Sequence, residues 1–401
     1  MENSGRFSAF YSRDFRLFWI GQLISFSGTW MHSVAQGWLV YSLTKSPFYL
    51  GMVSAVSSLP VLLFTLIGGV VADRFGKRKL LLLTQTLSIF PALLIGLLTS
   101  MGAVEVWHVM ALGGILGTVN AFDVPARQSF LIEMVEKGNI LNAVALNSAA
   151  FNAARIIGPV IAGMAIAHIG LPACFYLNAL SFVPIIIALS VMKTKVAARP
   201  AGESLINELL AGMRFLKEEP YIWKAMFIVA LFSLLGIPFI TLLPIFAEEI
   251  LKVGVKGFGF LAASAGAGAF TAAVSLAFKG RITGERRLMR VTSLIFPASL
   301  VIFSRSTDYY LSMAALFIAG WSLVSFLAVA NSSIQLKTPD GLRGRVMSVY
   351  TLLFLGMAPI GNLVIGVTAA ATGTANAVTL TSGICLAVSI AIAAGLRGKE
   401  A

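Results

Sequence analysis

Long apolar runs separated by short polar and charged segments dominate the pattern along this chain of 401 residues. A helix that crosses a bilayer needs about 20 residues, at 1.5 Å each. Runs of that length recur along almost the whole chain, and they are continuous and rich in Leu, Ala, Ile and Gly. Strands of a membrane β-barrel would instead alternate in polarity over about ten residues. The pattern therefore predicts an all-α integral membrane protein.

Breaks at Pro, Gly and charge clusters divide these runs into twelve predicted transmembrane helices. They cover residues 17–43, 48–72, 79–100, 104–125, 142–168 and 172–192, then 222–247, 257–279, 288–304, 309–332, 345–371 and 376–396. The longest polar stretch separates six from six and has helical periodicity in part. The predicted organisation is a tail (1–16), a six-helix bundle (17–192), a linker with an amphipathic helix (193–221), a second six-helix bundle (222–396) and a tail (397–401).

Composition and the placement of charge support this interpretation. Hydrophobic residues make up 58% of the chain and charged residues 12%, whereas a soluble domain carries about 25% charged residues. Of the 30 Lys and Arg, the loops on one side hold only Lys45, Lys252, Lys256 and Arg305, and Arg155 lies inside a span. Because cytoplasmic loops hold the excess of bases, both termini are predicted to be cytoplasmic. Anionic headgroups on the inner leaflet are then sufficient partners for the net charge of +13, and no nucleic acid is expected as a partner.

Sites for nucleotide, metal and catalysis are not indicated. A phosphate loop needs G-x-x-x-x-G-K-[ST], but Val71 stands at its first Gly and Arg78 follows Lys77. The chain has no H-E-x-x-H motif and no Cys/His cluster, and Cys174 and Cys385 both lie in apolar segments. The Gly-rich stretch "SAGAGAF" lies within a span, where small residues allow close helix packing. We therefore expect no enzyme, no metal and no organic cofactor.

Arg155 is the most conspicuous polar residue of the spans. It lies near the middle of the helix predicted at 142–168, where a charge costs about 2.5–3.5 kcal/mol and must face inward. Ser148, Asn152 and Arg155 are spaced i, i+4 and i+7, which places them on one helical face. No Asp or Glu is expected at a similar depth. Two roles remain open, a substrate or gating contact and a structural hydrogen-bond anchor.

A second polar face follows the first predicted span, which suggests a water-filled cavity. Thr29, His32 and Gln36 belong to this face, although a single His is also typical of a helix contact. The further candidates for the cavity wall are Ser58, Trp321 and Ser325. For Trp321, packing is the competing role, and the hydroxyl of Ser58 could bond its own backbone.

The segment Gly69-Val-Val-Ala-Asp73-Arg74-Phe-Gly76-Lys77-Arg78-Lys79 resembles the signature between helices 2 and 3 of the major facilitator superfamily. Asp73 can face a helix N-terminus, Gly76 permits a tight reversal, and the bases mark the cytoplasmic side. In that family the matching Asp tethers helix 2 to helix 11, which makes Arg343 and Arg345 possible partners of Asp73.

Three further stretches, "NAFDVPARQSF" (120–130), "LNSAAFNAARIIGPVIAG" (146–163) and "TPDGLRGRVMSVY" (338–350), resemble the branch that contains enterobactin exporters and macrolide efflux proteins. On this resemblance the motif residues with a conformational role also include Asp123, Arg127, Gly158 and Pro159. The Arg in helix 4 that is typical of some other drug antiporters is absent.

The resemblance implies a secondary transporter of the bacterial cytoplasmic (inner) membrane, working as a monomer by alternating access of two six-helix bundles. It implies export of an amphipathic small molecule, such as a siderophore or a macrolide, driven by a proton gradient. A lysophospholipid-type flippase and a solute importer of the same fold remain alternatives. A non-transporting sensor is a further alternative, for which an added soluble domain is expected.

Overall fold

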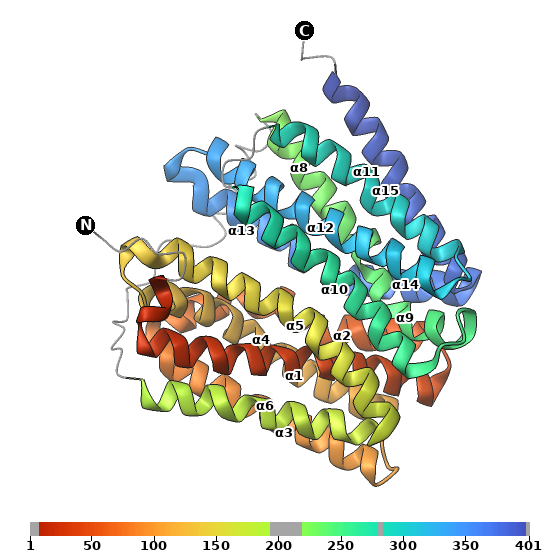
Figure 1. Cartoon of the computed structure of the whole chain (residues 1–401), viewed down its shortest axis with the longest axis horizontal. Helices are drawn as coiled ribbons and strands as arrows, with labels where there is room; N and C mark the ends of the chain where they lie inside the picture. The colour runs from red at the N-terminus through yellow and green to blue at the C-terminus, as the bar shows by residue number, and fades with distance from the viewer. Residues whose placement is uncertain (1–7, 193–218, 280–283, 398–401) are drawn as a thin grey trace. The chain divides into compact units, whose positions relative to one another are not determined.

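A computed structural model describes residues 8–192, 219–279 and 284–397, and within them every regular element is a helix (Figure 1). The predicted amphipathic helix of the linker lies outside the described residues. The elements are η1 (Ser8–Tyr11), α1 (Arg13–Thr44), α2 (Pro47–Phe75), α3 (Lys77–Ser100), α4 (Val106–Glu133), η2 (Lys137–Asn139), α5 (Ile140–His168), α6 (Leu171–Val191), α8 (Pro220–Leu231), η3 (Phe232–Gly236), η4 (Ile237–Leu242), α9 (Leu243–Ile245), η5 (Phe246–Ile250), α10 (Gly254–Lys279), α11 (Glu285–Arg305), α12 (Tyr309–Lys337), α13 (Asp340–Gly356), α14 (Ala358–Thr372) and α15 (Thr374–Arg397).

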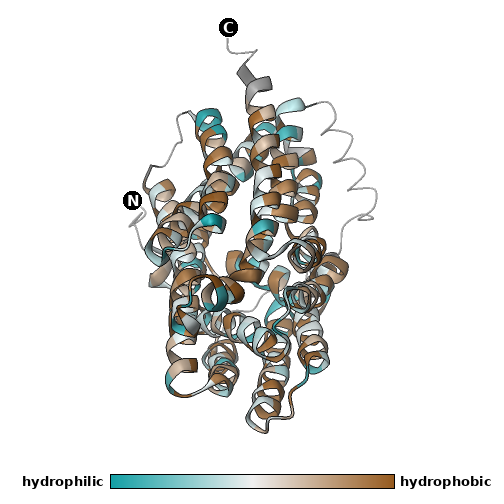
Figure 2. Cartoon of the chain, turned by 90° about the vertical axis from the view of Figure 1, so that its right-hand side faces the viewer, coloured by the Kyte–Doolittle hydropathy of each residue, from teal (hydrophilic) through white to brown (hydrophobic). Residues whose placement is uncertain are grey.

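The described helices confirm the predicted helical membrane fold. Eleven of them are long and apolar enough to span a bilayer, counting the runs Pro220–Ile250 and Leu342–Thr372 as one span each. The remaining predicted span, 17–43, coincides with α1, whose polar side chains lower its hydropathy. In Figure 2 apolar residues extend along most of the helices and hydrophilic residues form shorter patches. Large apolar side chains such as Phe90 and Leu180 expose 59% and 62% of their surface, which suits a lipid environment.

The chain divides into two compact units. Unit 1 contains residues up to Leu43 and Val56–Gly202, and unit 2 contains Thr44–Ala55 and the chain from Glu203 onward. The start of α2 thus packs with unit 2, where a Cβ at Gly51 would meet the backbone of α14.

Unit 1 is held together by aromatic and aliphatic side chains between α1, α3, α4 and α6. Phe15 and Phe18 of α1, Leu81 of α3, Phe130 of α4 and Leu189 of α6 are all buried in one cluster. The rings of Phe18 and Phe130 meet edge to face, with centroids 5.7 Å apart. This core fixes the inner face of α1, which carries many of the polar candidates.

Unit 2 relies on small residues for close packing of α10 against α12. A Cβ at Gly268 would fall on the carbonyl oxygen of Phe317, and a Cβ at Gly320 would fall on that of Ala265. Gly268 belongs to "SAGAGAF", so the expected role of this stretch in close packing is confirmed. Carbonyl contact of this kind excludes any side chain at either glycine.

Prolines interrupt the seventh span as their positions predict, and helix boundaries differ from the predictions at two other places. Pro238 and Pro244 interrupt the seventh span with π-helical and 3₁₀ turns between α8 and η5, as their missing N–H groups require. The eleventh span breaks at Met357, just before Pro359, into α13 and α14. By contrast, α4 continues through Pro125 to Glu133 instead of ending at residue 125.

Candidate functional site

Arg155 lies on α5 against an aromatic wall in unit 1. Its guanidinium carbon is 5.3 Å from the centroid of the Trp30 ring on α1. Phe151, one turn earlier on α5, packs edge to face on Trp30 and on Phe26. Among the residues that the structure describes, none forms an ion pair or a hydrogen bond with Arg155. The face of Trp30 is the described contact that stabilises its charge.

Close contact between α1 and α5 sets this geometry. A Cβ at Gly158 would lie 2.6 Å from Cβ of Trp30 and 2.7 Å from the carbonyl oxygen of Ser27. Only glycine allows the two helices to approach this closely, and α5 continues unbroken through Pro159 to His168. Gly158 thus brings Trp30 within reach of Arg155.

The predicted face of α5 holds polar groups that form no hydrogen bond with Arg155 within the described residues. Asn152 is buried and donates from Nδ2 to the carbonyl oxygen of Ser148, at 2.9 Å. Ser148 itself is exposed. Because Asn152 bonds its own helix, it leaves the Arg155 guanidinium available to another acceptor.

The polar side chains of α1 form hydrogen bonds either with other helices or within α1 itself. His32 is buried and accepts at Nδ1 a hydrogen bond from Nδ2 of Asn178 on α6, at 3.2 Å. This contact favours the packing role for His32. Thr29 donates to the carbonyl of Ser25 in its own helix. Gln36 donates from Nε2 to Oγ of Ser57 on α2, at 3.3 Å.

Asp123, one of the motif residues named from the family resemblance, is a buried carboxylate that joins α3 and α4. Asp123 exposes 2% of its surface, and its Oδ1 accepts from Oγ1 of Thr84 and Nε2 of Gln85, both at 2.8 Å. Its Oδ2 lies 3.1 Å from the guanidinium of Arg127, which is also 4.7 Å from the Phe26 ring centroid. The expectation that no acid lies deep in a span was therefore wrong, because α4 continues past Asp123.

This network extends to α1, since Ser25 donates to Oε1 of Gln85 at 3.3 Å. Thr84 and Gln85 were not predicted as members of it. The one available signal was the polar Thr-Gln pair within the apolar run of α3. Asp123 accepts from three donors and is one turn from Arg127, so it is a satisfied structural charge.

The signature segment forms the turn between α2 and α3. Gly76 has φ of 83°, so the predicted tight reversal is confirmed at a conformation that other residues adopt with strain. Lys77 is buried and pairs with Glu133 at the end of α4. Arg78 donates to the carbonyls of Leu189 (2.6 Å) and Ser190 (2.8 Å) at the end of α6. These two bases therefore connect the start of α3 to the ends of α4 and α6, in addition to marking a membrane side.

The other residues of the signature lie at the end of α2. Gly69 has open space around it, and Arg74 lies exposed in the last turn of α2, next to Asp73. The side chain of Asp73 lies outside what the structure describes, and so does its predicted partnership with Arg343 and Arg345. The Nε of Arg343 donates to the carbonyl of Gln335, at 3.1 Å.

Three candidates for the cavity wall lie on α2 and α12. Ser58 of α2 and Trp321 of α12 are half-buried. Ser325 of α12 is 1% exposed, and its hydroxyl has no hydrogen-bond partner within the described residues. Over 8–192, 219–279 and 284–397, no three His, Cys, Asp or Glu side chains form a group that could hold a metal ion.

Comparison with known proteins identifies the family. The family model described as transmembrane secretion effector matches residues 4–400. The staphyloferrin A transporter of Staphylococcus aureus is 23% identical over 88% of this chain and 89% of that protein. The multidrug efflux pump Tap of Mycolicibacterium fortuitum is 25% identical over 86% of this chain and 87% of the pump. The enterobactin exporter EntS of Shigella boydii is 24% identical over 88% of this chain and 84% of the exporter.

Solved structures share the fold. A bacterial homologue of the lysosomal transporter Spinster, facing inward and unoccupied, superposes with a TM-score of 0.72 at 14% identity, covering 98% of this chain and 96% of that one. A D-xylose–proton symporter gives a TM-score of 0.74 at 11% identity, covering 95% and 97%. Both comparisons confirm the predicted major facilitator fold. The family and these relatives are transporters, so the chain is a membrane transporter and not an enzyme, and it belongs to the transmembrane secretion effector family of the major facilitator superfamily.

Proposed function

We propose that this transporter exports an amphipathic small molecule, such as a siderophore, a macrolide or another drug, by alternating access. The names of the relatives support export, since they include an enterobactin exporter and a multidrug efflux pump. The observation that carries the proposal is the Arg155 guanidinium, which lies over Trp30 without a carboxylate partner among the described residues.

The chemistry of this pair favours a substrate with both an aromatic or apolar body and an acceptor group. The Trp30 face contributes about 2 kcal/mol to a desolvated cation, against the roughly 2.5–3.5 kcal/mol that a charge costs at the centre of a span. A carboxylate or phenolate of the substrate would supply the rest, and the planar guanidinium binds such groups through two parallel hydrogen bonds. Phe26 and Phe151 extend the apolar wall beside it.

We further propose that the proton gradient drives export and that both termini are cytoplasmic, in a bacterial inner membrane. The loop distribution of Lys and Arg supports the orientation. Both native cysteines are buried, so a single cysteine introduced at an exposed position near the end of a span can be labelled selectively from either side of the membrane. Labelling of a cysteine at Lys79 from outside intact cells would contradict the orientation.

The test of the site is efflux by cells that lack their own pumps. Cells expressing the protein are loaded with a macrolide, with enterobactin or with a fluorescent lysophospholipid, and retention is followed over time. For the substrate that the protein exports, Arg155→Ala should slow efflux about ten- to a hundredfold, as expected for a lost hydrogen bond to a charged group. Arg305→Ala, at the exposed end of α11, is the matched control and should export normally.

Membrane levels of both variants are measured in parallel. Normal efflux by Arg155→Ala at normal levels would remove Arg155 from the site. Transfer of the lysophospholipid alone would identify a flippase instead, and faster uptake than in cells with an empty vector would identify an importer.

A further inference from the structure

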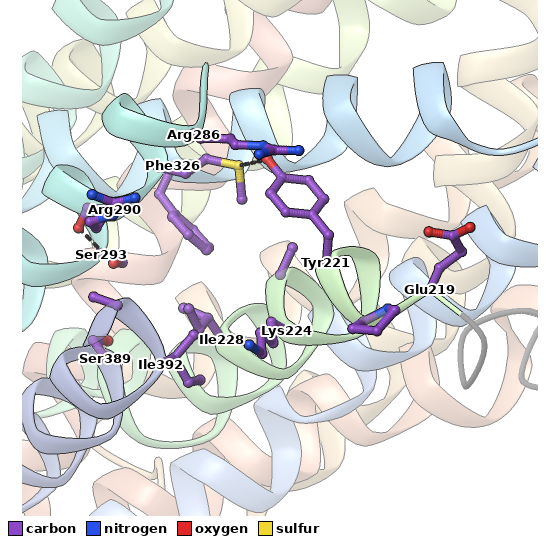
Figure 3. Close-up of a pocket in the computed structure, with 14 residues that line it drawn as sticks. Glu219, Tyr221, Lys224, Ile228, Arg286, Arg290, Ser293, Phe326, Ser389 and Ile392 are labelled. Atoms are coloured by element: carbon purple, nitrogen blue, oxygen red, sulfur yellow. Dashed lines mark hydrogen bonds between the residues drawn. The ribbon is translucent and has the colours of Figure 1, made fainter. Parts of the chain in front are cut away.

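Unit 2 contains a cavity of about 240 Å³ that Arg155 and its neighbours do not line. It lies where α8 and α11 begin and where α15 approaches its end, and Figure 3 shows side chains of all three helices directed into it. Ligand pockets for drug-sized molecules occupy about 300–1,000 Å³. This cavity is therefore suited to a smaller group.

The polar side of the cavity is basic. Lys224 of α8 and Arg286 and Arg290 of α11 line it, and Glu219 is the one carboxylate among its lining residues. In Figure 3 Glu219 lies beyond Tyr221, away from Arg290. An excess of positive charge in a confined space attracts an anion.

The neighbouring acid on α11, Glu285, does not pair with Lys224 or Arg286. Glu285 accepts from Ser333 at 2.9 Å and pairs with Lys337 at 3.5 Å. The Lys337 ammonium in turn lies 3.6 Å from the centroid of the Tyr221 ring, and the Arg286 guanidinium lies 5.4 Å from it. Tyr221 thus holds Arg286 at the wall of the cavity without removing its charge.

The inner part of the cavity is apolar except for one hydroxyl. Ile228, Phe326 and Ile392 supply the apolar surface. Ser389 is 0% exposed, and its hydroxyl has no hydrogen-bond partner within the described residues. A buried hydroxyl without a partner costs free energy that a bound acceptor would recover. The cavity therefore offers a cationic rim, an apolar interior and an unused donor.

Its position allows access from the bilayer. The cavity residues of α8, α11 and α15 occupy one end of three membrane-spanning segments. Beside it Trp223, Phe227 and Ile390 expose 49%, 45% and 53% of their surface, as lipid-facing side chains do. With the orientation proposed above, this end lies in the cytoplasmic leaflet, which holds anionic lipids.

We propose that this cavity binds the headgroup phosphate of an anionic phospholipid, with the adjoining part of its acyl chains against the apolar surface. Basic pockets between transmembrane helices on the cytoplasmic side bind such headgroups in other membrane proteins. Arg286 and Lys224 contact the phosphate, and Ser389 donates to an oxygen of the lipid. The site is separate from the proposed export site and does not depend on which substrate is exported.

The test measures lipid-dependent stability of the purified full-length protein in a neutral detergent. Phosphatidylglycerol is titrated while the melting temperature is followed, with phosphatidylcholine, glycerol 3-phosphate and inorganic phosphate as separate arms. Only phosphatidylglycerol should stabilise the protein at low concentration. Arg286→Glu should weaken its apparent affinity roughly 25-fold, which is about fivefold for each unit of charge.

Arg287→Glu is the matched control. It makes the same change on the adjacent residue, which is exposed and does not line the cavity, and it should keep the affinity within about twofold. If Arg286→Glu alters the melting temperature without lipid, the milder Lys224→Gln replaces it, with about fivefold weakening expected. Equal losses for Arg286→Glu and Arg287→Glu would overturn the proposal, as would equal stabilisation by glycerol 3-phosphate or inorganic phosphate.

Discussion

Replacing Asp123 by Asn would remove one negative charge from a side chain that exposes only 2% of its surface. The amide keeps an acceptor oxygen for Thr84 and Gln85, which both donate to the same Oδ1 of the native carboxylate at 2.8 Å. Its NH₂ group would then face the Arg127 guanidinium, now 3.1 Å from Oδ2. Two donors would meet where a donor and an acceptor meet in the native protein.

The loss of stability depends on the interactions that Arg127 loses and on those that it retains. A hydrogen bond to a charged group contributes about 1.5–3 kcal/mol, whereas breaking a fully buried ion pair costs about 3–5 kcal/mol. The smaller range applies, because the Arg127 side chain is 15% exposed and retains the Phe26 ring. At about 2–4 °C per kcal/mol for a unit of this size, the melting temperature of unit 1 should fall by roughly 3–12 °C.

Two buried cysteines make it possible to measure each unit separately. Cys174 lies in unit 1 and Cys385 in unit 2, and both thiols are buried. In a Cys385→Ala background, a thiol-reactive dye reports the unfolding of unit 1 during heating. In a Cys174→Ala background it reports unit 2. Asp123→Asn should lower the first melting temperature more than the second.

A second variant tests the cause. Adding Arg127→Gln to Asp123→Asn restores a donor–acceptor pair without charge, so most of the stability should return and the two changes should not be additive. Additive losses, or equal shifts at Cys174 and Cys385, would refute the argument that this ion pair stabilises unit 1.

Two further predictions concern helix contacts. Gly320→Leu should destabilise unit 2 by about 1–3 kcal/mol or more, since its Cβ falls on the Ala265 carbonyl; Gly383→Ala, where a Cβ meets nothing within 4 Å, should be neutral or slightly stabilising in the same melting assay. Arg78→Ala should cost about 1 kcal/mol because two carbonyls at the end of α6 lose their donor. Lys79→Ala, at an exposed neighbour, should leave the melting temperature unchanged, and equal effects of Arg78→Ala and Lys79→Ala would contradict the structural role of Arg78.

Apolar length and glycine placement made most of the fold predictable. Continuous apolar runs allow only helices in a bilayer, and Gly76 was recognised because a short reversal needs a residue that tolerates positive φ. The end of α4 was not predictable from Pro125, because proline is tolerated within membrane helices. The i,i+4 pair of Asp123 and Arg127 spans that proline and supports the helix beyond it.

The candidate site was predictable only in part, because periodicity identifies a helical face and not the helix that covers it. The face of α5 with Arg155 was predicted, but its contact with Trp30 depends on the approach of α1 at Gly158. Likewise His32 was placed on a polar face of α1, although its partner Asn178 lies on α6. Contacts between residues far apart in sequence require tertiary information.

Arg155 and Asp123, two charges of unit 1, lie in different environments, and this difference leads to a test of the two roles that the sequence left open for Arg155. A structural anchor would resemble Asp123, and its loss would lower the melting temperature. Arg155 has instead an aromatic face and no described acceptor, so its desolvation is poorly offset in the absence of substrate. Arg155→Gln should therefore leave the melting temperature of unit 1, measured at Cys174, unchanged or raise it by a few degrees, while efflux is lost. Functional sites are often less stable than the same positions would be with other residues. A fall as large as that for Asp123→Asn would show that Arg155 is an anchor.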